Sequence, residues 1–147
     1  TLWESAMVFQ IKRMGYDEHR WLDSGDVPNV QFLASVCEVA RQTPNVMHWL
    51  PTREVKTLLA FIKQYGADHI PTNLNIRVSA PMVNDKPLSA FDNIPQVTTS
   101  TVHDKHNVPQ GRSCPARTRG RFTLRNFGIC EWFSFAIIYL LRMIRSR

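Results

Sequence analysis

Four short polar clusters in this chain contain the kinds of side chain from which binding and catalytic sites are built. They are Asp23-Ser24-Gly25-Asp26, Thr52-Arg53-Glu54, Ser79-Ala80 and Ser100-Thr101-Val102-His103. Carboxylates and imidazoles can transfer protons, and an arginine can hold a carboxylate or phosphate through two parallel hydrogen bonds. These residue types suit a site for a small polar ligand, provided that the fold brings them together.

Eight side chains in and between these clusters are the candidate catalytic residues. They are Asp23, Ser24, Asp26, Thr52, Arg53, Arg77, Ser79 and His103. Arg77 is included because it lies in a segment that otherwise reads as buried, and a buried arginine needs a partner. That partner could be Asp23 or Asp26 in an ion pair, or the carboxylate or phosphate of a substrate.

Each cluster also has a purely structural interpretation. Gly25 could make a tight turn, and Asp26 could cap the helix that begins near Pro28. Thr52 could likewise cap a helix, or the Thr52-Arg53 pair could hold an anion at that helix start. His48 lies within a predicted strand, where a histidine is more often a hydrogen-bonded core residue than a ligand.

The elements that must position these residues alternate along the chain. Apolar residues at helical spacing predict helices over 3–14, 30–42 and 55–65, and Gly15 and Gly66 are natural stops for the first and last. Strands are predicted over 19–22, 45–50, 75–80 and 95–101. Such alternation indicates an α/β fold with a parallel sheet, either a partial barrel or an open three-layer sheet. In both, ligands bind beyond the carboxyl ends of the strands, where all four clusters are predicted to lie.

The charge of the 147-residue chain is divided unevenly. Residues 1–104 carry a net charge of −2, whereas residues 105–147 carry +8. We therefore expect an α/β core domain over 1–104 and a separate basic, aromatic tail over 105–147. Three cysteines argue against a secreted disulfide framework. Because the chain shows neither a starting Met nor a leader, we expect a cytoplasmic protein whose core is incomplete at its N-terminus.

Several segments in order resemble a known family. RWLDSGDV (20–27), TPNVMHWLPTRE (43–54), NIRVSAPMV (75–83), TSTVHD (99–104) and SCPA (113–116) are similar to phage and prophage proteins of the gene product 88 type. The resemblance covers about residues 20–116 and implies no established activity. Family members are similar, at a distance, to radical-SAM-like βα barrels, which is a fold-level analogy only.

The resemblance also implies cysteine clusters on both sides of the core. Cys114 would be the first metal ligand of the downstream cluster, which would hold zinc or an iron–sulfur cluster in the complete protein. The further cysteines expected after Ala116 are missing. We therefore expect this chain to bind no metal tightly. His103 and His106 flank Asp104, but their spacing matches no strong zinc signature.

Three interpretations fit the tail. A reading-frame shift near residue 116 would explain why the resemblance and the composition change together. The uncharged run 132–141, or 127–141 if Glu131 is included, is shorter than the roughly 20 residues that a span needs. Together with Arg142, Arg145 and Arg147 it could form an interfacial membrane helix. The arginines between 112 and 125 could instead bind nucleic acid.

Two functions are therefore carried forward. The first is a phage-type protein, metal- or iron–sulfur-dependent in its complete form, that binds a small ligand at the strand ends. The second is a non-catalytic nucleic-acid-binding module that uses the basic C-terminal segment. If the first is an enzyme, Asp23, Arg53 and Arg77 should share one pocket. The sequence contains no Walker loop, G-x-G-x-x-G, H-E-x-x-H or G-x-S-x-G motif.

Overall fold

The computed structural model describes residues 1–104, 106 and 107, and Thr1–Val108 forms one compact unit. The elements follow one another in this order: α1 (Leu2–Met14), β1 (Glu18–Arg20), α2 (Val30–Gln42), β2 (Met47–Thr52), α3 (Val55–Tyr65), η1 (Ala67–His69), β3 (Leu74–Val83), η2 (Ser89–Phe91) and β4 (Val97–Val102). The fold class is α/β, as predicted.

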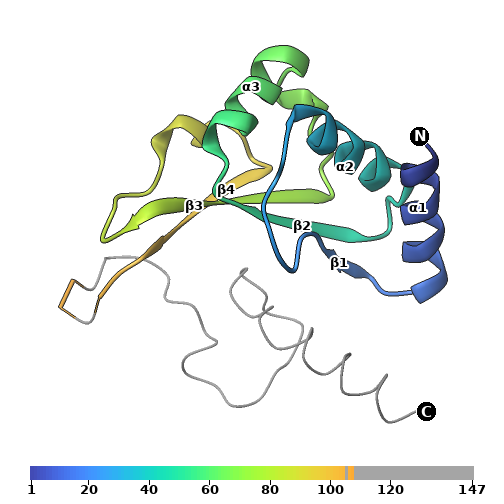
Figure 1. The fold of residues 1–147 in the computed structure, drawn as a ribbon, viewed down its shortest axis with the longest axis horizontal. Helices are drawn as coiled ribbons and strands as arrows, with labels where there is room; N and C mark the ends of the chain where they lie inside the picture. The colour runs from blue at the N-terminus through green and yellow to red at the C-terminus, as the bar shows by residue number, and fades with distance from the viewer. Residues whose placement is uncertain (105, 108–147) are drawn as a thin grey trace, which may run out of the picture. The chain divides into compact units, whose positions relative to one another are not determined.

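The four strands form one open, all-parallel sheet in the order β1-β2-β3-β4. Trp49 of β2 lies beside Arg20 of β1 and Asn75 of β3, and Arg77 lies beside Pro51 and Thr98. Because each strand pairs with its neighbours in sequence, right-handed crossovers place α2 and α3 on the same side of the sheet (Figure 1). In the described residues, α2 and α3 therefore lie on one face of an open sheet, and not on both faces as in a three-layer sheet.

The core lies between this sheet face and the helices. In β2 and β3, burial alternates along the strand, so His48, Leu50, Ile76 and Val78 face the helices. The helices contribute the matching apolar side chains, namely Leu33, Val36, Cys37, Leu58 and Phe61, each at most 1% exposed. Cys37 is thus a core residue on the apolar stripe of α2.

Helix boundaries follow local chemistry. In α1, the Thr1 side chain accepts from the backbone of Glu4 while Glu4 bonds back to the N-terminus, and Gly15 ends the helix at φ 65°. Asn29, not Asp26, caps α2: its side chain accepts a 2.8 Å hydrogen bond from the backbone N–H of Phe32. The prediction that Asp26 caps this helix is therefore wrong.

The limits of β1 and β2 differ from the prediction for local reasons. β1 ends at Arg20 because Leu22 turns the chain away at φ 56°. β2 continues through Pro51, which has no backbone N–H. An N–H at this position would point toward β1, the side on which the Trp49 carbonyl accepts from the backbone of Trp21. β1 has already ended there, so the proline costs no ladder hydrogen bond.

The interpretations of the tail, and the role of Cys114, concern residues outside the described part of the chain. Within that part, no helix is long and apolar enough to cross a membrane.

Candidate functional site

The carboxylate of Asp26 joins the loop after β1 to the end of β2. Its Oδ1 accepts hydrogen bonds from the Thr52 hydroxyl and, at 2.7 Å, from the Val27 backbone. Its Oδ2 accepts from the backbone N–H of Arg53 at 2.8 Å. Thr52 in turn accepts from the backbone of Glu54 at 3.0 Å, at the start of α3. Three predicted site residues, Asp26, Thr52 and Arg53, are therefore in direct contact.

The side chain of Arg53 is exposed and reaches across to β3. Its Nη2 donates to the backbone carbonyl of Pro81 at 2.5 Å. Among the described residues, Arg53 takes part in no ion pair. One end of this residue is fixed by Asp26 and the other by Pro81, so a positive charge is held at the carboxyl ends of two neighbouring strands.

Arg77 lies on the sheet face opposite the helices. Its Nη1 donates to the Thr98 hydroxyl at 3.4 Å, and Thr98 donates to Asn75 at 3.0 Å. Asp23 pairs with Arg20 instead (3.7 Å), and Asp26 is occupied as described above. The predicted ion pair between Arg77 and either aspartate is therefore not formed, because both carboxylates find partners closer in the chain or on β2.

The hydroxyls of Ser79 and Ser100 lie 3.2 Å apart on β3 and β4. Both were expected at strand ends, but β3 continues to Val83 and β4 to Val102. The strands remain paired because an irregularity after Ser79 resets the register, so that Val83 lies beside Val102. Ser79 and Ser100 therefore lie within the sheet rather than beyond it.

In the first cluster, Asp23 and Ser24 are exposed, whereas Asp26 is half-buried. Asp23 is 69% exposed in its side chain and contacts Arg20, whose guanidinium lies 5.1 Å from the centre of the Trp49 ring. Ser24 is exposed in the turn beside Gly25, which has φ 82°. An L side chain at position 25 would be strained at this φ, so the turn itself explains the glycine.

The His103 region has a local structural role. His103 Nε2 lies 2.8 Å from the Thr101 hydroxyl. Asp104 accepts hydrogen bonds from the backbone of His106 and Asn107 and from the side chain of Asn84. These bonds lower the pKa of the Asp104 carboxyl, the Asn84 contact most strongly.

The described residues do not fit a zinc or iron–sulfur centre. They contain no group of three or more His, Cys, Asp or Glu side chains able to hold a metal ion. The one cysteine among the described residues, Cys37, is buried, and burial raises the pKa of its thiol to about 12. Cys37 packs within the apolar core and belongs to no such group.

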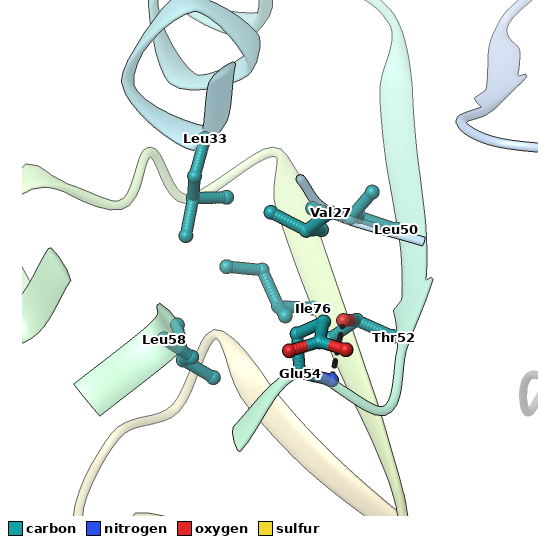
Figure 2. A pocket seen from close by; sticks show the side chains of 7 residues that line it. All are labelled: Val27, Leu33, Leu50, Thr52, Glu54, Leu58 and Ile76. Carbon is teal, nitrogen blue, oxygen red and sulfur yellow. Dashed lines mark hydrogen bonds between the residues drawn. The ribbon is translucent and has the colours of Figure 1, made fainter. Parts of the chain in front are cut away.

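A small pocket lies between the sheet and α2 and α3, and it is too narrow to hold a water molecule. Figure 2 shows its lining, which is Val27, Leu33, Leu50, Thr52, Glu54, Leu58 and Ile76. The lining is apolar except at the Thr52 end, and neither Asp23, Arg53 nor Arg77 belongs to it. The expectation that these three share a pocket is not met here, and this pocket is best explained as incomplete packing.

The sequence alone did not indicate a buried hydrogen-bond network at the amino end of β2. His48 is 1% exposed and lies between two hydrogen-bond partners. The Nε1 atom of the Trp21 indole is 3.2 Å from His48 Nδ1, and the Thr43 hydroxyl is 2.8 Å from His48 Nε2. Burial, and secondarily the nearby His19, lowers the pKa of His48 to about 4. His48 is thus a hydrogen-bonded core residue, as predicted, but its partners could be found only from the strand register.

Comparison with known protein families identifies the family of this chain. The Gene product 88 family model matches residues 3–120. The chain belongs to the Gene product 88 family. The match begins in α1, before the predicted limit at residue 20, and includes every element of the sheet. No curated protein and no solved structure matches the chain. Membership of the Gene product 88 family thus supports a phage-type protein and assigns no activity.

Proposed function

We propose that this domain binds a small anion, a phosphate or carboxylate group, at the carboxyl ends of β2 and β3. The observation that carries the proposal is the position of Arg53, whose guanidinium is anchored by one nitrogen to the Pro81 carbonyl. The other guanidinium N–H groups are planar, charged donors of the kind that bind carboxylates and phosphates. Parallel sheets commonly bind ligands at this edge.

Polar residues on the neighbouring strands β3 and β4 favour the same ligand class. Arg77 and the hydroxyls of Ser79 and Ser100 lie on these strands, and guanidinium and hydroxyl groups are donors to oxyanions. The β3 residues Asn75, Arg77 and Ser79 make this part of the face opposite the helices polar, whereas parallel sheets are usually apolar on both faces. A polar face suits a surface that contacts a polar ligand.

The overall charge of the domain favours a small anion over a polyanion. Residues 1–104 carry a net charge of −2, which repels an extended nucleic-acid backbone. A single guanidinium can still hold one phosphate or carboxylate group, because that interaction is local and direct. The proposed ligand is therefore a small molecule.

Titration of the full chain with inorganic phosphate, and separately with acetate, tests this proposal. Arg53→Gln should weaken binding of the preferred anion by about tenfold or more, since a charge-assisted hydrogen bond is lost. Lys56→Gln is the matched control, because it removes one exposed positive charge from α3 and should leave the affinity unchanged. Equal affinity of Arg53→Gln and the unaltered chain would contradict the proposal.

A second function rests on a different observation, the net charge of +8 over residues 105–147. A segment of this charge can bind nucleic acid through phosphates. The affinity of the full chain for a labelled oligonucleotide should then fall steeply with salt. Replacing Arg117, Arg119 and Arg121 with glutamine should reduce the slope of log Kd against log salt by about 2 to 3. An unchanged slope would refute this function.

A further inference from the structure

Asp26 accepts more hydrogen bonds than a turn or a helix cap requires. Its two carboxylate oxygens accept from Val27 N, Thr52 Oγ1 and Arg53 N, which belong to two segments 26 residues apart in the chain. The cap of α2 is supplied separately by Asn29. Asp26 is therefore free of the structural role that the sequence assigned to it.

We infer that Asp26 is a positioning residue that holds Arg53 in place for the anion. This inference rests on the proposed function of Arg53. Asp26 fixes the backbone N–H of Arg53, and the Pro81 carbonyl fixes the tip of its side chain. Both ends of the residue are held before a ligand arrives, so little side-chain freedom remains to be lost on binding.

A positioning role of Asp26 and a purely electrostatic role predict opposite effects on phosphate binding when its negative charge is removed. A carboxylate near an anion site opposes anion binding through its negative charge. If Asp26 acted only through its charge, Asp26→Asn would strengthen phosphate binding. If it positions Arg53, the same substitution weakens binding, because the amide keeps only one acceptor oxygen and cannot retain both the Thr52 bond to Oδ1 and the Arg53 bond to Oδ2.

Asn29→Ala provides a matched control for stability. Asn29 belongs to the same loop and its loss removes the cap of α2, but it makes no hydrogen bond to Thr52 or Arg53. Asn29→Ala should therefore lower the melting temperature and leave phosphate affinity unchanged. Asp26→Asn should change both, with phosphate affinity falling by about tenfold.

Two measurements on the full chain test the inference. Titration with inorganic phosphate gives the affinity of each variant. Amide hydrogen exchange at Arg53 reports directly on its hydrogen bond to Asp26, whether or not phosphate binds. We expect exchange at Arg53 to accelerate by about tenfold or more in Asp26→Asn and not in Asn29→Ala.

The possible failures are separable. If the unaltered chain binds neither phosphate nor acetate, the proposed function is wrong, and with it the positioning role. If phosphate binds but Asp26→Asn leaves its affinity and the exchange of the Arg53 amide unchanged, only the positioning role is overturned. Should Asp26→Asn fail to fold, Thr52→Val removes one of the ties to Asp26, and a weaker loss of affinity with faster exchange at Arg53 is then expected.

Discussion

The indole N–H of Trp21 donates a hydrogen bond to Nδ1 of His48 across 3.2 Å of the protein core. Because Nδ1 accepts this bond, the imidazole proton lies on Nε2, where it can be donated to the Thr43 hydroxyl. Thr43 in turn donates to the Val39 carbonyl at 2.7 Å. The chain of hydrogen bonds therefore links the exit of β1, the start of β2 and the last turn of α2, and it requires a neutral histidine.

Acidification should destabilise the fold through His48. Its pKa is lowered to about 4 in the folded chain, so below the ordinary pKa near 6.5 the unfolded state binds a proton that the folded state does not. The stabilising effect of neutral His48 is thus complete above about pH 6.5 and is lost progressively as the pH falls toward 4. Urea unfolding should show a loss of about 2 kcal/mol in the free energy of unfolding between about pH 7.5 and pH 5.

His48→Gln is the comparison for this measurement, since glutamine does not titrate. This variant should be less stable at neutral pH but should lose less stability than the unaltered chain over the same interval. Parallel pH profiles of the two proteins would show that His48 is not the group responsible. His19 has a pKa lowered by burial as well, and it accounts for part of any slope that remains.

Trp21→Phe should destabilise the protein by about 2 kcal/mol, because the substitution leaves a buried imidazole nitrogen without its donor. Trp3→Phe is a suitable control, as Trp3 is 40% exposed and lies 6.1 Å from the Trp21 ring in the same aromatic group. Thermal or urea unfolding would check both. Equal losses in the two variants would mean that ring packing, rather than the hydrogen bond, accounts for the effect.

Asn73 should be among the most sensitive polar residues for stability. Its amide nitrogen lies within 3.1 Å of the carbonyls of Ala40, Thr43 and Val46, which form the connection between α2 and β2. Asn73→Ala should cost about 2 kcal/mol, and Asn73→Asp should cost more, because it places a negative charge against these carbonyls. Asn107→Ala, in an exposed turn, serves as the control, and urea unfolding provides the measurement. A loss no larger than that of the control would be inconsistent with this role.

The thiol of Cys37 should be unreactive in the folded protein. It is fully buried, and burial raises its pKa to about 12, so almost no thiolate exists at neutral pH. In a chain with Cys114→Ser and Cys130→Ser, a thiol reagent should react with Cys37 about a hundredfold more slowly in the folded protein than in the unfolded protein. Rapid reaction under native conditions would indicate that α2 separates readily from the sheet.

The periodicity of the sequence predicted the fold class and most of the helices. Val55 to Tyr65 begins and ends where expected, because an apolar stripe and a glycine define it locally. Strand limits were less accurate: β3 was expected to end at Ala80 but continues to Val83. Its extension depends on pairing with β4 after a register irregularity, and pairing of this kind is not encoded by neighbouring residues alone.

The candidate site was predicted in its composition but not in its contacts. The polar cluster around Thr52 and Arg53 was correctly placed at the end of β2, because this rule depends only on strand direction. The partners of Asp26 and Arg77 were assigned wrongly. An aspartate in an Asp-Val-Pro-Asn segment has several local donors, and only the three-dimensional positions of Thr52 and Arg53 decide among them.

The sequential order of the strands has a consequence for how the chain is made. Within the described part of the chain, each strand hydrogen-bonds only to the strand synthesised immediately before or after it. As the chain leaves the ribosome, β2 therefore meets β1 already in place, and β3 meets β2, with a short helical crossover closing each unit. Folding can advance in the direction of translation, and no strand must wait for a partner encoded far downstream.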